Sequence, residues 1–250
     1  MKRISFLLFI LFIISCDNSV SEVEQLKYSE EDLRPLEALD QIEYYKDAAF
    51  IEFWELSKDS LKRLNQVELD YESIRTFYDD LLLIYNNSYR ISNSFFEYAK
   101  SLHSYGSLVL YTITVSVDTN KEWISNWNSG IKTTGHEEID RIISDYDLDV
   151  ELLFASDYKF FYKINSEKPM NYLALMEKLK NTDQFLNIEP AILIGGGANI
   201  TLMIEDNTKN YTYYYGWGDC TSGCLHAHYW IVKVVGQEVT LVDEGGDILN

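Results

Sequence analysis

The sequence predicts an α+β protein with its helices and strands in separate regions. Helical spacing of apolar residues dominates residues 29–105, which we expect to form an N-terminal helical bundle. Residues 106–250 predict an α+β domain, because short runs of β-branched and aromatic residues appear there. Within it, residues 106–192 mix strand and helix patterns, whereas residues 193–250 hold strand patterns only and predict an antiparallel β-meander.

The chain begins with a predicted export signal, "MKRISFLLFILFIISC". Lys2 and Arg3 precede a short apolar run, which is typical of a secretory signal and is shorter than the roughly 20 residues that a membrane-spanning helix needs. "IISC" resembles the bacterial lipobox, and this resemblance implies that residues 1–15 are a lipoprotein signal peptide and that Cys16 is lipidated. Polar residues 16–28 then predict a lipidated tether.

Charge restricts the expected partners. The net charge is -19, and loss of residues 1–15 with two basic side chains would leave 19 basic against 40 acidic residues, or -21. Such a surface repels nucleic acid, so acyl chains such as palmitate on Cys16, rather than basic residues, would hold the protein to a membrane. We expect a cell-envelope protein, lipid-anchored to a bacterial membrane and facing the periplasm or the surface, whose further partner is an envelope protein or a glycan.

The helical region shows three apolar stripes at helical spacing. The second, over residues 74–85, fits the helical template at every position, and "NNS" at residues 86–88 ends it. The first stripe comprises Leu39, Ile42, Tyr45, Ala49, Phe53 and Leu56, and the third Ile91, Phe95, Ala99 and Leu102. We expect the stripes to face one another in a small antiparallel bundle.

The middle region predicts the element order β-α-β-β-α-β. This is the split βαβ arrangement of ferredoxin-like folds. The expected elements, in order, lie at residues 108–117, 136–148, 149–154, 158–164, 170–181 and 186–194.

Residues 107–192 resemble the prodomains of subtilisin-like proteases. The resemblance lies in "IDRIISDYDLDVELLF", followed by an aromatic strand, a helix and then "LNIEPA". That resemblance implies a protease-inhibitor or prodomain-like binding module.

Four strands are expected in the C-terminal region, at residues 199–206, 210–217, 225–235 and 238–244. "IGGGANI" before them lacks the lysine and the following helix of a phosphate-binding loop and predicts a hairpin turn. Alternation along the strands places two sets of side chains each on one face. These are Tyr211, Tyr213, Tyr215 and Trp217 on one strand, and His226, His228 and Trp230 on the next. Exposed, they would be a candidate binding surface; the alternative is that the stripe is buried sheet core.

Two cysteines lie in "WGDCTSGCLHAHYW", between the two aromatic strands. With Cys16 lipidated, Cys220 and Cys224 form an even pair in an exported protein, which favours a disulfide with Gly223 available to turn the chain. Two alternatives stay open. The thiolates with His226 and His228 would supply four metal ligands, and a site of the two histidines assisted by Asp219 would survive oxidation; a cysteine could also be a nucleophile with a histidine as its base.

"YYYGWGDCTSGCLHAHYWIVKVVGQEVTLVDEGG" resembles the C-terminal segment of uncharacterised bacterial secreted proteins and lipoproteins that share G-W-G-D-C-x-S-G-C followed by H-Y-W. The resemblance implies a disulfide-closed cysteine turn and an exported location, and it implies no activity.

We therefore expect a membrane-anchored envelope lipoprotein with a non-enzymatic binding or structural role and no cofactor. A protease-inhibitor-like module and a metal-dependent hydrolase using the region of His226 and His228 are the alternatives.

Overall fold

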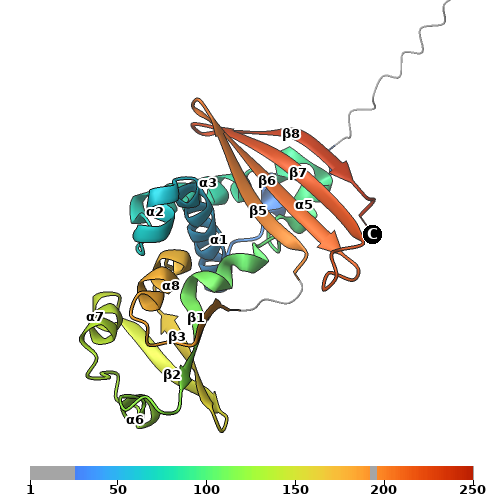
Figure 1. Cartoon of the computed structure of the whole chain (residues 1–250). Helices are drawn as coiled ribbons and strands as arrows, with labels where there is room; N and C mark the ends of the chain where they lie inside the picture. Colours follow the sequence, from blue (N-terminus) through green and yellow to red (C-terminus); the bar gives the residue numbers. More distant parts are fainter. Residues whose placement is uncertain (1–25, 192–195, 250) are drawn as a thin grey trace, which may run out of the picture.

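The computed structural model describes residues 26–191 and 196–249. The predicted signal peptide, Cys16 and most of the tether lie outside the described residues. Helices and an upper sheet form one part of the molecule, and a smaller sheet with its own helices lies below them (Figure 1). Within the described ranges, no helix is long and apolar enough to cross a membrane.

The N-terminal region is helical, as predicted. A short 3-10 helix, Glu30–Asp32, precedes five α-helices whose starts are mostly set by a polar cap. Asp59 accepts hydrogen bonds from the first turn of α2, Asp70 caps α3, and Ser92 caps α5. The helices are α1 (Ala38–Ser57), α2 (Ser60–Asn65), α3 (Tyr71–Asn86), α4 (Ser88–Ile91) and α5 (Asn93–Ala99).

Burial along α3 follows the predicted stripe, but burial along α1 does not. Leu39 and Ile42 are 73% and 49% exposed, whereas Tyr44, Ala48 and Ile51 are buried. The expected stripe on α1 is therefore wrong in its first half. The helix packs against α3 and against the C-terminal sheet, so a wider arc than one stripe is covered.

The middle region has the predicted split βαβ topology. A 3-10 helix, η2 (Tyr105–Tyr111), replaces the start of the expected first strand, because Leu110 is buried in the core and Gly106 lies against the ring of Phe50. All strand pairs are antiparallel, in the order β2-β3-β1-β4. The elements are β1 (Thr112–Asp118), α6 (Ile124–Asn128), α7 (Glu137–Asp145), β2 (Leu148–Ala155), β3 (Lys159–Ser166), α8 (Tyr172–Lys180) and β4 (Asn187–Pro190).

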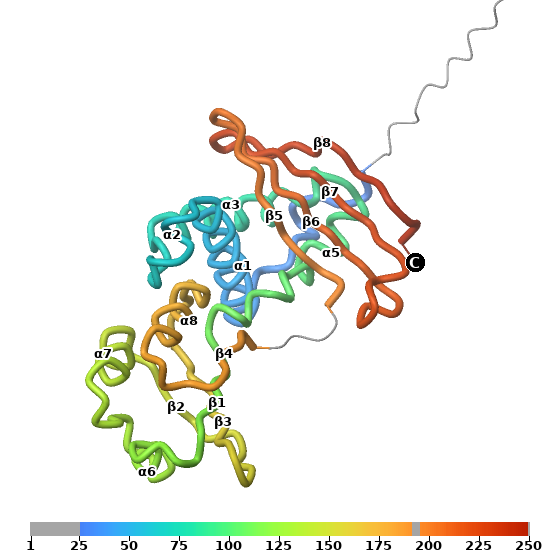
Figure 2. Tube along the Cα trace, viewed as in Figure 1, coloured from blue at the N-terminus to red at the C-terminus, as the bar shows by residue number. Residues whose placement is uncertain are grey.

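The C-terminal region is the predicted four-stranded meander, in the order β5-β6-β7-β8. Its strands are β5 (Ala198–Glu205), β6 (Thr208–Trp217), β7 (His226–Val235) and β8 (Glu238–Gly246). The helices lie behind one face of this sheet in Figures 1 and 2, and the other face is uncovered. Exposed apolar side chains such as Met203, Tyr214 and Val242 agree with an open face.

Two hydrophobic clusters fill the molecule, and neither belongs to the helical region alone. The first joins α1, α3 and α5 to the meander, where Phe95 packs edge-on against Tyr213 and lies 5.8 Å from Trp230 between ring centroids. The second lies within the split βαβ region. The predicted N-terminal helical region is therefore present, with α1 packed on α3, and its helices are also buried against a sheet from the far end of the sequence.

Candidate functional site

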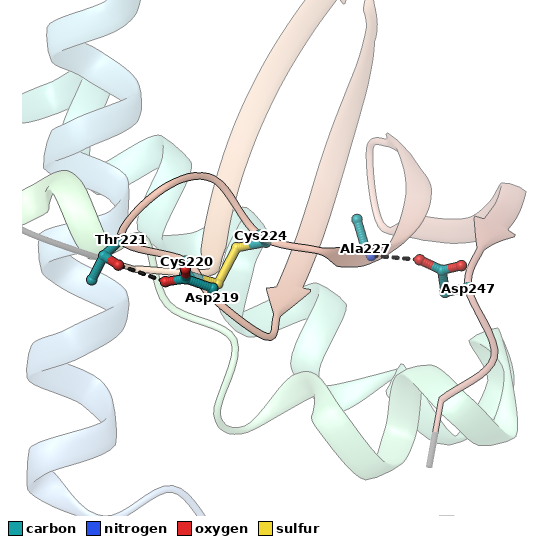
Figure 3. The surroundings of a disulfide bond; sticks show 6 residues. All are labelled: Asp219, Cys220, Thr221, Cys224, Ala227 and Asp247. Carbon is teal, nitrogen blue, oxygen red and sulfur yellow. Dashed lines mark hydrogen bonds between the residues drawn. A yellow bond between two sulfur atoms is a disulfide. The ribbon is translucent and has the colours of Figure 1, made fainter.

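The cysteine turn connects the ends of β6 and β7. Gly218 and Gly223 adopt positive φ values of 92° and 101°, which favour glycine and let the chain reverse. Cys220 and Cys224 are joined by a disulfide, and Asp219 accepts a hydrogen bond from the hydroxyl of Thr221 within the turn (Figure 3). The disulfide favoured by the sequence is present.

Glycines beside the disulfide let three segments approach closely. A Cβ atom at Gly197 would overlap the carbonyl oxygen of Gly216, and one at Gly216 would lie 2.6 Å from Sγ of Cys224. The predicted hairpin turn at "IGGGANI" is wrong, because β4 and β5 lie in different sheets. At least Gly197 serves instead to pack the start of β5 against β6 and the disulfide.

The disulfide changes what the turn can do chemically. Neither sulfur is left as a thiolate, so the four-ligand metal site and the cysteine nucleophile are both contradicted. Over the described residues, no group of three or more His, Cys, Asp or Glu side chains is placed to hold a metal ion. Asp219 lies in the turn, whereas His226 and His228 pair with acidic residues near the end of β8.

The first half of the aromatic stripe is buried sheet core, which is one of the two alternatives that the sequence left open. Tyr211 and Tyr213 are 0% and 1% exposed, and Trp230 is fully buried. Their face of the sheet is the one that the helices cover, so the buried-core alternative holds for these residues. His228 is also buried, at 9% exposed, and lies 4.6 Å from Trp230 between ring centroids.

Polar atoms on this covered face are paired with the helices. The hydroxyl of Tyr211 donates to Asp80 of α3 at 2.6 Å, and burial raises the pKa of Tyr211 far above its ordinary value. Trp230 Nε1 donates to Ser94 Oγ at 2.9 Å, and Ser94 in turn donates to Glu244. These bonds fix the helices on the sheet, since a buried donor without a partner would destabilise the fold.

The second half of the aromatic stripe on β6 is partly exposed to solvent at the end of the strand. Tyr215 and Trp217 are partly exposed, and their rings stack with centroids 5.4 Å apart. Trp217 also stacks on His226 at 5.5 Å, and Nδ1 of His226 lies 3.4 Å from Oδ2 of Asp247. We call Tyr215, Trp217, His226 and Asp247 the rim patch.

The rim patch is held by strand pairing and by the C-terminal segment. Trp217 and His226 face each other in the register of β6 and β7. Oδ2 of Asp247 accepts a hydrogen bond from the backbone N–H of Ala227 at 3.0 Å, which fixes the carboxylate beside β7 (Figure 3). The side chains of His226 and Asp247 are 54% and 52% exposed, and Leu225 beside them is 71% exposed. An aromatic ring, an imidazole and a carboxylate therefore face solvent together.

No protein family, curated protein or solved structure matched this chain in our comparisons. The resemblances to secreted proteins with a cysteine turn and to protease prodomains stay predictions.

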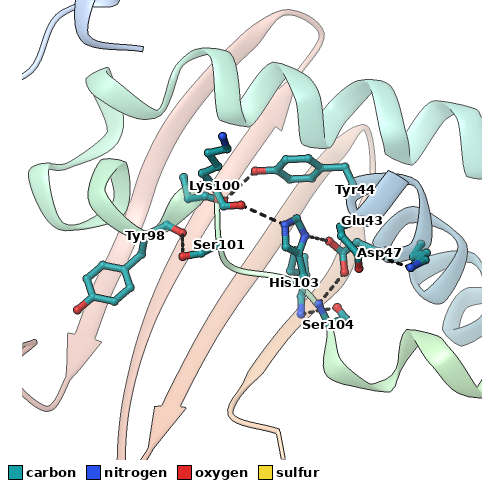
Figure 4. A network of polar contacts seen from close by, with 11 residues as sticks. Glu43, Tyr44, Asp47, Tyr98, Lys100, Ser101, His103 and Ser104 are labelled. Atoms are coloured by element: carbon teal, nitrogen blue, oxygen red, sulfur yellow. Dashed lines mark hydrogen bonds and ion pairs between the residues drawn. The ribbon is translucent and has the colours of Figure 1, made fainter. Parts of the chain in front are cut away.

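Sequence reasoning missed one buried polar site. Asp47 on α1 is 1% exposed; it lies 2.7 Å from Nδ1 of His103 and accepts the backbone N–H of Ser104 at 2.6 Å (Figure 4). Nε2 of His103 lies 3.1 Å from the carbonyl oxygen of Lys100, so both ring nitrogens face acceptors. Ser104 Oγ then accepts the backbone N–H of Ile200 at 3.0 Å, which links α1 to β5.

The pKa of His103 reflects this pairing. Burial lowers it, but the hydrogen bond and the negative charge of Asp47 outweigh burial, and the net shift of the His103 pKa is upward. His103 sits in the loop after α5, and no sequence pattern links it to a carboxylate 56 positions earlier. We interpret the site as a structural connection between α1, this loop and β5.

Proposed function

We propose that this protein is a lipid-anchored component of a bacterial cell envelope, with a binding role and no catalytic one, and that the rim patch is its binding surface. The observation that carries the proposal is the partly exposed stack of Tyr215, Trp217 and His226 beside the carboxylate of Asp247. Rings of this kind stack on the apolar faces of sugars, and the polar groups beside them hydrogen-bond to hydroxyls.

The ligand class proposed for the rim patch is a neutral glycan. A net charge of -19 disfavours anionic polymers through long-range repulsion, whereas a neutral polysaccharide meets no such barrier. The disulfide supports an exported location, because disulfides persist in oxidising compartments.

Binding at the rim patch can be tested by affinity electrophoresis through gels that contain a neutral β-glucan, a mannan or a dextran. At least one should retard the protein, and Trp217→Ala should weaken the retardation at least about tenfold. Tyr214→Ala is the matched control, because Tyr214 lies on the same strand, is 39% exposed and points to the opposite face. No retardation by any neutral polysaccharide, or equal retardation of Trp217→Ala, would refute the glycan proposal.

Anchoring is tested separately, by growing cells with an alkyne-tagged palmitate. The wild-type protein should carry the tag and sediment with membranes, and Cys16→Ala should carry no tag. Label that persists in Cys16→Ala would place the lipid elsewhere or remove the lipoprotein proposal.

The alternative role, a protease-inhibitor or prodomain-like module, is favoured by one observation, the ferredoxin-like strand order β2-β3-β1-β4. An extended tail after β4 would be needed to enter a protease cleft, and here the chain goes on to pair β5 with β6. The absence of inhibition of a panel of subtilisin-like proteases at micromolar concentration would eliminate this alternative.

A further inference from the structure

A pocket distinct from the rim patch is lined by residues of α1, α8 and the edge strand β5. Its volume is about 520 Å³, within the range of small-molecule sites. Most of its wall is apolar or aromatic. The apolar and aromatic lining residues are Ile51, Phe53, Trp54, Tyr172, Leu173, Ile200 and Leu202.

The aromatic side of the pocket is preorganised. The rings of Phe53 and Tyr172 stack with centroids 5.1 Å apart, and Trp54 packs edge-on against Phe53 at 5.4 Å. Trp54 is nevertheless 51% exposed, which leaves much of a large apolar side chain facing water. A ligand in the pocket would cover that surface.

The charged side chains that line the pocket carry a net positive charge, whereas the whole chain carries a net charge of -19. Glu55 and Lys58 pair with each other at 2.6 Å, which leaves Arg63 as the unbalanced charge. Among the described residues, no carboxylate lies within 4.0 Å of the Arg63 guanidinium.

The backbone at Arg63 is held in place, while its side chain is exposed. The buried side chain of Asn171 donates to the backbone carbonyl oxygens of Arg63 and Gln66, at 2.9 and 2.8 Å. The positive charge of Arg63 partly offsets the rise that burial causes in the pKa of Tyr172, so the guanidinium acts on a hydroxyl of the pocket wall.

We propose that this pocket binds a small amphipathic carboxylate, with its apolar body against Phe53, Trp54 and Leu173 and its carboxylate on Arg63. Guanidinium groups bind carboxylates through paired hydrogen bonds, and the wall accommodates an alkyl or aryl body. This site goes beyond the proposed glycan surface and does not depend on it.

The test uses the predicted mature chain, residues 16–250 with Cys16→Ala, and two probes with the same alkyl chain and opposite charge. Decanoate and decyltrimethylammonium are titrated below their critical micelle concentrations. Binding is measured by calorimetry and by tryptophan fluorescence. Decanoate should bind saturably and at least about tenfold more tightly than the cation, and Arg63→Gln should lose about tenfold of the decanoate affinity. Lys62→Gln, which removes a neighbouring cation outside the pocket lining, should bind decanoate like the parent.

A second variant guards against effects on folding. Leu173 is partly exposed on α8 and lines the pocket, so Leu173→Trp should fill part of it and block decanoate while leaving the circular dichroism spectrum unchanged. Trp217→Ala should bind decanoate normally, which separates this site from the rim patch. Absence of saturable decanoate binding, equal affinity for the cationic probe, or full binding by Leu173→Trp would overturn the proposal.

Discussion

Glu52 on α1 is a buried carboxyl group that forms no ion pair with any described residue. It is 7% exposed, and burial raises its pKa from 4.5 to about 7, although the backbone N–H of Asp70 partly opposes the rise. The folded state therefore holds a proton that the unfolded chain releases at lower pH. The free energy of unfolding falls as pH rises from about 4.5 to 7, and the loss is complete above that window.

Glu52→Gln should remove this dependence. At pH 8 we expect the variant to be more stable than the parent by about 1–2 kcal/mol, because no charge is buried, and the two should converge near pH 4. Urea unfolding at several pH values measures the effect. Glu238→Gln, at an exposed position on β8, is the control and should shift little. A Glu52→Gln curve parallel to that of the parent across the window would contradict the prediction.

His103 and Asp47 should behave as a coupled pair. His103→Gln leaves the buried Asp47 carboxyl without its partner and should lower the free energy of unfolding at pH 7 by about 3 kcal/mol. Asp47→Asn in the same chain should recover part of that loss, since no charge then needs a partner. Chemical denaturation of the two single variants and the double variant measures the coupling; strictly additive losses would show that the pair does not interact.

At the scale of elements, the cysteine turn can be tested for a structural role against a metal-binding one. Replacing both Cys220 and Cys224 by Ser opens a loop of very few residues, so the cost in the free energy of unfolding should be at most about 2 kcal/mol. The protein exported through an oxidising compartment should show no free thiol when denatured, and no bound zinc. Two free thiols with stoichiometric zinc would contradict both the disulfide and the assignment of the turn as structural.

Element prediction succeeded where packing agreed with local pattern. The apolar stripe on α3 and the alternation of residues on β6 and β7 correctly predicted which side of each element is buried. They did so because each of these elements buries only one side. It failed at η2, where "LVLY" has strand composition, because Leu110 is needed in the core and the close approach of Gly106 to Phe50 holds a tight turn. Propensity is a weak signal when a tertiary contact opposes it.

For the whole molecule, the two hydrophobic clusters predict different behaviour of isolated pieces. Residues 111–191 contain nearly all of the second cluster and should fold alone, with cooperative thermal unfolding. Residues 26–105 should not, because Phe95 and the buried side of α1 would lose the sheet that covers them. Circular dichroism on both fragments tests this, and cooperative unfolding of residues 26–105 alone would show that the helices need no sheet.

The candidate site could be located from sequence only in part. "WGDCTSGCLHAHYW" identified the turn, the cysteine pair and the aromatic strands. It could not show which aromatic rings are buried, because alternation gives the face of a strand and not what covers that face. Asp247 of the rim patch and the α1–α8–β5 pocket carry no motif; both arise from segments that only the fold brings together.

The sequence by itself determined the element types, the split βαβ order, the meander, the cysteine pair and the expectation of an exported lipoprotein. These depend on local periodicity, turn residues and short motifs, all of which lie within a few neighbouring positions. Only the tertiary structure decided that the N-terminal helices pack on the C-terminal sheet, that Tyr211 and Tyr213 are core while Trp217 reaches solvent, and that Asp47 meets His103. The physical reason is that burial and charge pairing are set by contacts between segments far apart in the chain, and one sequence does not encode those contacts in any local pattern.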